Sequence, residues 1–88
     1  MSIRVELFGI PRERAGIAET TAEGSRLGEV LLDLARRYPR LGETCFEGGR
    51  LQAGYVVNLN GQRFVLDPAT EVQPGDSLLI LSADAGGC

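Results

Sequence analysis

The residues best suited to chemistry lie at the end of the 88-residue chain, in Gly86-Gly87-Cys88. A glycine carboxylate is the least hindered acyl group that a protein terminus can offer. Consecutive glycines also leave the backbone torsions free, so that such a tail can enter the narrow active site of another protein. Gly86 and Gly87 therefore favour activation of a C-terminal carboxylate. From these residues alone, a disordered glycine-rich end is an equally good interpretation.

The residues and motifs that other kinds of chemistry require are absent from the sequence. Histidine is absent, which removes Ser-His and Cys-His nucleophile pairs and the commonest metal ligand. There is no glycine-rich phosphate-binding motif, and no acidic pair stands out as general acid and base. Cys45 and Cys88 form neither a disulfide framework nor a Cys-x-x-Cys motif. We therefore expect no enzyme and no metal site, and we interpret Cys45 as a small, partly buried filler.

Composition excludes further classes. The net charge is −3 and the basic residues are scattered, which argues against nucleic-acid binding. The pair Arg36 and Arg37 is interpreted as a solvated helix face. No apolar run approaches the roughly 20 residues of a membrane span, and the N-terminal residues do not resemble a signal peptide. These features predict a cytoplasmic protein of one domain.

Periodicity predicts the elements that must carry the tail. Residues 1–8 alternate between apolar and polar types, as in a half-buried strand, and Pro11 can begin a single helical turn over residues 11–15. Apolar residues recur at helical spacing over residues 27–38, with Ser25 as the expected N-cap and Pro39 as the stop. Residues 41–53 show no clear period and are predicted to form a long surface loop.

The remaining segments complete a sheet. Further strands are predicted over residues 17–21, 54–59, 62–65 and 77–81. Asn60-Gly61 favours a type I′ turn and Pro74-Gly75 a type II turn. The last strand is apolar on both faces, which is typical of the middle of a sheet. This order predicts an α+β fold in which one main helix covers a mixed sheet of four or five strands, with a domain over residues 1–81 and a flexible tail over residues 82–88.

The open face of that sheet is the expected partner-binding surface. Phe8 falls opposite the apolar positions of the first strand, and Val56 shares a side with two asparagines, so both are predicted to point outward. The last strand must add one alternate pair, either Leu78 and Ile80 or Leu79 and Leu81. Leu79 and Leu81 are the pair that we assign to partner binding together with Phe8 and Val56. Exposed apolar groups clustered in this way tend to mark an interface.

Taken in order, the segments of this chain resemble the MoaD/ThiS family of ubiquitin-like (β-grasp) sulfur carriers over nearly the full length. The segments that carry the resemblance are Val5-Glu6-Leu7-Phe8, Arg12-Glu13-Arg14-Ala15-Gly16, the helix over residues 27–38, Tyr55-Val56-Val57-Asn58-Leu59-Asn60-Gly61, residues 72–80 and Ala85-Gly86-Gly87.

The resemblance implies a carrier that is a substrate of other enzymes and binds no cofactor itself. An E1-like adenylyltransferase uses ATP to adenylate the terminal glycine, here Gly87. Gly86, which precedes it, keeps the tail narrow because it has no side chain. A persulfide from a sulfur donor of the cysteine desulfurase or rhodanese type then displaces AMP. The resulting thiocarboxylate gives its sulfur to a downstream biosynthetic enzyme.

Cys88 departs from the family pattern, because it follows the double glycine. Some carriers of this kind are trimmed to the glycine by a JAMM-type metalloprotease, which is the interpretation we favour for Cys88. Alternatively, Cys88 was added for labelling, or its thiol works directly. Two other functions are compatible with the sequence: a protein modifier joined through Gly87 to lysines, and the small subunit of molybdopterin synthase, with which Arg12-Glu13 and Gly16 agree.

Overall fold

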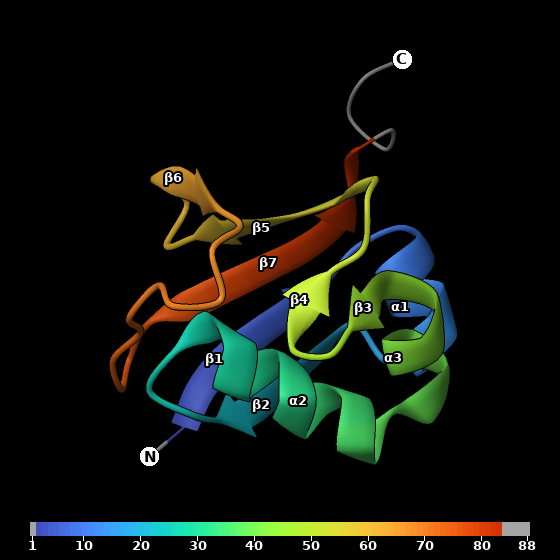
Figure 1. Ribbon diagram of the computed structural model, residues 1–88, viewed down its shortest axis with the longest axis horizontal. Coiled ribbons are helices and arrows are strands. Elements are labelled where there is room, and N and C mark those ends of the chain that lie inside the picture. The colour runs from blue at the N-terminus through green and yellow to red at the C-terminus, as the bar shows by residue number, and fades with distance from the viewer. Residues whose placement is uncertain (1, 84–88) are drawn as a thin grey trace.

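A five-stranded mixed sheet in the order β2-β1-β7-β5-β6 forms one layer of the protein in the computed structural model, which describes residues 2–83 (Figure 1). β7 lies in the middle, parallel to β1 and antiparallel to β5. The predicted mixed sheet and its central last strand are therefore confirmed. The strands of this sheet are β1 (Ser2–Leu7), β2 (Glu19–Glu23), β5 (Tyr55–Leu59), β6 (Arg63–Val65) and β7 (Ser77–Ser82).

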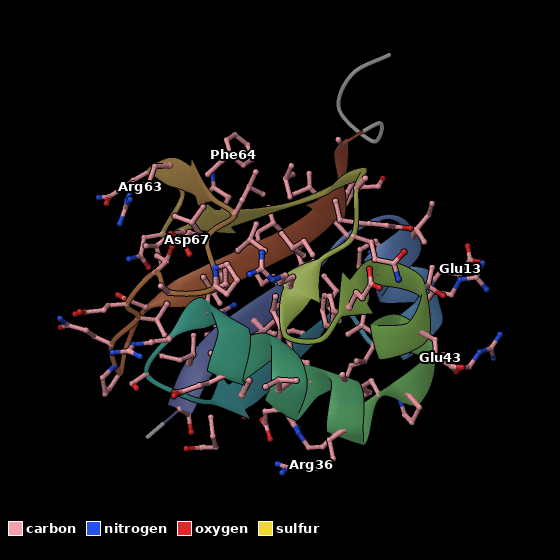
Figure 2. The ribbon with its side chains drawn as sticks, in the orientation of Figure 1. Glu13, Arg36, Glu43, Arg63, Phe64 and Asp67 are labelled. Atoms are coloured by element: carbon pink, nitrogen blue, oxygen red, sulfur yellow. The ribbon has the colours of Figure 1, made fainter. Side chains whose placement is uncertain are left out.

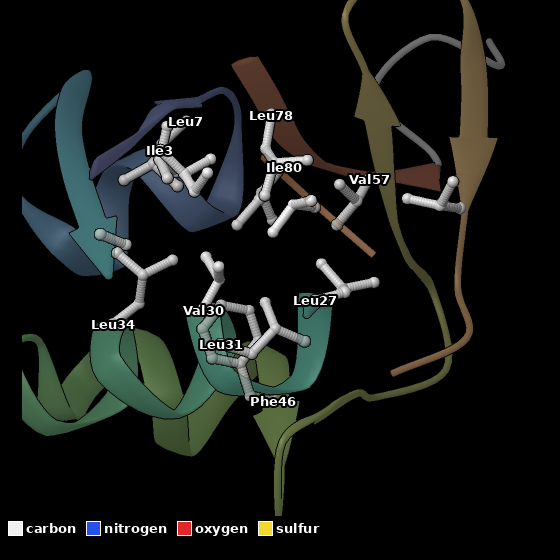
Figure 3. Packing of buried hydrophobic residues seen from close by; sticks show 14 of the residues in the cluster. Ile3, Leu7, Leu27, Val30, Leu31, Leu34, Phe46, Val57, Leu78 and Ile80 are labelled. Atoms are coloured by element: carbon white, nitrogen blue, oxygen red, sulfur yellow. The ribbon is translucent and has the colours of Figure 1, made fainter. Parts of the chain in front are cut away.

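The main helix, α2 (Leu27–Arg37), packs its apolar stripe against one face of this sheet. Figure 3 shows the labelled side chains of α2 facing those of β1, β5 and β7. Burial of this stripe is the main source of helix stability, because an isolated helix of this length is marginal in water. The side chains of the stripe and of the facing strands that are fully buried include Ile3, Val5, Leu27, Val30, Leu34, Val57, Leu78 and Ile80.

The start of α2 differs from the prediction. The N-cap is Arg26, which makes no side-chain cap, and Ser25 lies one residue earlier. Glu29 reaches back instead: its carboxylate accepts hydrogen bonds from the Ser25 N–H at 2.7 Å and the Ser25 hydroxyl at 3.0 Å. Two first-turn amides donate to the carbonyls of Pro68 and Thr70. The helix start is thus satisfied by a distant turn, which Ser25 alone could not reveal.

The predicted long loop over residues 41–53 is wrong. Pro39 does end α2, but it also begins a second helix, α3 (Pro39–Cys45), as proline can at a first helical position. Leu41 and Cys45 lie one helical turn apart and are both fully buried. A Cβ added at Gly42 would lie 2.7 Å from the Ala35 Cβ, so glycine allows α3 to approach α2 closely. A short hairpin follows, formed by β3 (Phe46–Glu47) and β4 (Arg50–Leu51).

The first helical turn is confirmed as α1 (Ile10–Ala15), and it ends at Gly16 in the left-handed conformation. The second strand lies two residues later than predicted, because Ile17 and Ala18 complete the turn out of α1. Both predicted tight turns form. Asn60 and Gly61 have the positive φ angles of a type I′ turn, and Gly75 has φ 92° with a bond from the Asp76 N–H to the Gln73 carbonyl.

The outer edge of β2 is covered by side chains of α2. Asp33 is largely buried and accepts a hydrogen bond from the Glu23 N–H at 3.0 Å. Arg37 donates to the Thr21 carbonyl and, at 3.1 Å, to Asp33, while Arg36 also pairs with Asp33. Arg36, labelled in Figure 2, and Arg37 are therefore parts of an ion-pair network rather than only a solvated face.

Candidate interaction surface

The face of the sheet opposite α2 carries an apolar patch formed by three strands and the residue after β1. Leu78 and Ile80 are fully buried against the helix, so Leu79 and Leu81 face the other way. Val56 is the register partner of Leu81. Phe8 is 51% exposed, whereas Val56, Leu79 and Leu81 are each partly exposed. The structure thus brings the four predicted partner-binding residues together on one open face.

Phe64 also belongs to this patch, although the sequence did not place it among the partner-binding residues. It is 64% exposed and is the register partner of Asn58 on the open face (Figure 2). A two-residue Asn60-Gly61 loop would have paired Phe64 with Val57 and turned it inward. The loop instead contains three residues, since Leu59 pairs with Arg63. A register shift of one residue exchanges the two faces of a strand.

The last described residues, Ser82 and Ala83, lie at the same end of the sheet as Phe8 of the apolar patch. Ser82, which the sequence placed in the tail, is buried in β7 and pairs with Tyr55. The Ala83 N–H donates to the Gly54 carbonyl at 2.7 Å, so backbone pairing continues one residue beyond β7. The Phe8 N–H donates to the Ile80 carbonyl at 3.0 Å, which fixes Phe8 near this end. Gly86, Gly87 and Cys88 lie outside the described residues.

Cys45 is a core residue rather than a reactive thiol. It is fully buried and free, and burial raises the pKa of its thiol despite the adjacent Tyr55 hydroxyl and the Arg14 charge. A nucleophilic cysteine needs an accessible thiolate, and a raised pKa disfavours the thiolate form. Across residues 2–83, no group of three or more metal-ligating side chains occurs. Within the same residues, no helix is long and apolar enough to cross a membrane.

A central strand that is followed in the sequence by a glycine-rich terminus, together with an apolar open face of the sheet, is the arrangement expected of a ubiquitin-like carrier. The family model described as "ThiS family" matches residues 5–87. The chain belongs to the ThiS family. The resemblance inferred from its motifs is confirmed, and the fold is the β-grasp of ubiquitin-like sulfur carriers and modifiers, which are small carrier proteins rather than catalysts.

Solved structures agree with this membership. SAMP1, the small archaeal modifier protein 1 of Methanosarcina acetivorans, is 30% identical with a TM-score of 0.81, over 98% of this chain and 96% of that one. CysO of Mycobacterium tuberculosis is 28% identical with a TM-score of 0.78, over 92% and 98%. A chain of the Amycolatopsis orientalis BexX/CysO complex is 27% identical with a TM-score of 0.80, over 97% and 99%. No curated protein sequence matches the chain significantly.

Proposed function

We propose that this ThiS-family protein is a sulfur carrier whose Gly87 carboxylate, exposed by removal of Cys88, is converted to a thiocarboxylate. The observation that carries the proposal is the extent of the family match, which runs through Gly87 and leaves out Cys88. In the longer chain the Gly87 carbonyl is an amide, which has no carboxylate oxygen to attack ATP. Trimming by a JAMM-type metalloprotease is the step that we expect to supply this carboxylate.

Formation of the thiocarboxylate then follows in three steps on the C-terminal glycine. An E1-like enzyme joins the Gly87 carboxylate to the α-phosphate of ATP and releases pyrophosphate. The persulfide of a desulfurase or rhodanese-type donor displaces AMP, and a thiol cleaves the resulting S–S bond to leave the thiocarboxylate. A downstream enzyme accepts this sulfur.

The described residues support docking of the activating enzyme on the apolar patch. Phe8, Leu81 and Val56 lie at the end of the sheet from which the chain continues towards Gly87. Because Ala83 is held by Gly54, only residues 84–87 can extend into a partner, and four residues span at most about 14 Å. The active site of the activating enzyme must therefore lie within about this reach of Ala83. For this reason we propose that the enzyme contacts the apolar patch.

A second candidate function is protein modification through an isopeptide bond from Gly87 to lysines. The observation that favours it is the 30% identity to SAMP1 of Methanosarcina acetivorans, a small archaeal modifier protein. Both functions share the adenylate and differ in the attacking group, which is sulfur in one case and an amine in the other. Higher-mass adducts on whole-cell blots, lost when Gly87 is deleted, would support modification.

Intact-mass spectrometry tests the carrier function. The chain ending at Cys88 and the form ending at Gly87 are each incubated with ATP, a persulfide donor and the E1-like enzyme of the same genome. We expect only the shorter form to gain the mass difference between sulfur and oxygen. If the 88-residue form gains this mass while retaining Cys88, trimming is unnecessary and the cysteine terminus becomes the working group.

A further inference from the structure

Glu6 lies at the boundary between the two halves of the open sheet face. On one side, its register partner is Leu79 of β7, within the apolar patch. On the other side, its register partner is Glu19 of β2, next to a charged half that includes Arg4. Glu6 is exposed and belongs to the outward set of β1, opposite the buried Ile3, Val5 and Leu7.

The surroundings of Glu6 are electrostatically unfavourable in the isolated chain. Like charges directly opposite each other on neighbouring strands are destabilising, and Glu6 faces Glu19 in this way. Arg4 relieves only one of the two carboxylates, since its Nε lies 2.6 Å from a Glu19 oxygen. Within residues 2–83, no ion pair or hydrogen bond of the Glu6 side chain is present. A like-charge pair on neighbouring strands is unfavourable, and no contact among the described residues compensates the Glu6 carboxylate. Unfavourable arrangements of this kind are expected at functional positions.

We infer that Glu6 is a specificity-determining contact for the activating enzyme, whose docking surface presents an arginine or lysine to it. The inference rests on the proposed function for the identity of the partner. A protein that covers Phe8 and Leu79 also removes water from the adjoining Glu6 carboxylate. Burying a carboxylate without a partner is costly, so an apolar surface alone would bind this face poorly. A cation on the partner removes that cost and steers the encounter.

Charge variants separate this role from a structural one. Glu6→Gln removes the charge with little change of shape, and Glu6→Lys reverses it. Glu43→Lys is the matched control, because Glu43 is equally an exposed glutamate but lies on α3, which packs on the helix side (Figure 2). Each variant, in the form ending at Gly87, is measured for binding to the E1-like enzyme, for thiocarboxylation and for thermal stability.

We expect Glu6→Gln to weaken binding about threefold and Glu6→Lys roughly tenfold or more, mainly through the association rate. The loss should shrink at high salt, since screening weakens the attraction in the parent protein. Neither variant should unfold at a lower temperature, because both remove the repulsion from Glu19. Weaker binding combined with unchanged or higher stability is a result that a purely structural role for Glu6 would not produce.

Equal binding of the Glu6→Lys and Glu43→Lys variants would overturn the inference, as would failure of the parent protein to bind the enzyme. If the parent binds but is not thiocarboxylated, the proposed function fails. The comparison of enzyme binding between the Glu6 and Glu43 variants then still tests whether Glu6 contacts a cation on the enzyme.

Discussion

Replacing Asp33 should loosen the attachment of α2 to the edge of the sheet. Its carboxylate accepts hydrogen bonds from the backbone of Glu23 and from Arg36 and Arg37, and the side chain is only 9% exposed. Hydrogen bonds to a charged group contribute about 1.5–3 kcal/mol. The two arginines are more exposed, so we assign each roughly 0.2–1 kcal/mol. We therefore expect Asp33→Ala to cost about 2–5 kcal/mol.

Such a loss is large for a domain of this size, whose free energy of unfolding is expected at about 4–13 kcal/mol. It should lower the Tm by roughly 10 °C or more, since 1 kcal/mol corresponds to about 4–8 °C in small domains. Asp33→Asn keeps an oxygen acceptor for the Glu23 N–H but loses the attraction to the arginines, so its cost should be smaller. Glu13→Gln, at an exposed position on α1, is the control.

The effect should depend on pH in a defined direction. Burial by itself raises the pKa of Asp33, but the Glu23 N–H and the charges of Arg37 and Arg36 outweigh it and hold the pKa below its ordinary value of 3.8. A lowered folded-state pKa stabilises the protein fully above the unfolded-state value. That stabilisation is lost as pH falls through the folded-state value. The Tm difference between the parent and Asp33→Asn should therefore be constant above about pH 5 and narrow below about pH 4.

Circular dichroism during heating, repeated across this pH range, measures these quantities. The reasoning is refuted if Asp33→Asn melts with the Glu13→Gln control at neutral pH. It is also refuted if the Tm difference does not narrow in acid.

Two further predictions concern the open face and the core. Phe8→Asp and Phe64→Asp should each weaken binding to the E1-like enzyme by about tenfold or more without lowering the Tm, because both side chains are already more than half exposed. Leu32→Asp, at a position 54% exposed on α2, should leave binding unchanged when all are compared by surface plasmon resonance. In the form ending at Gly87, the Cys45 thiol should resist alkylation until denaturant is added, because it is fully buried and its pKa is raised. Rapid modification of the native protein, read by mass spectrometry, would contradict its place in the core.

Local patterns in the sequence determined the main elements. The helical spacing of Leu27, Val30 and Leu34 specifies α2, because only one face of a helix can meet the sheet. The apolar run of β7 specifies a central strand, since both of its edges are paired, one of its faces packs against α2, and the other carries part of the apolar patch. These signals depend on neighbours within a few residues, so they survive without knowledge of the tertiary structure. The resemblance of the other segments to a known family is what assigned a function to the double glycine.

Tertiary structure alone decided the face of Phe64, the existence of α3 and the burial of Asp33. Phe64 turns outward because of one extra residue in the hairpin loop, a register choice that alternation within β6 cannot show. Leu41 and Cys45 become core residues only because Gly42 admits α3 against α2. Asp33 lies outside the apolar stripe, yet it is buried because the edge of β2 offers it an N–H to accept from. Each outcome depends on contacts between segments that are distant in the chain. The free energies of such contacts cannot be inferred from the periodicity within one segment.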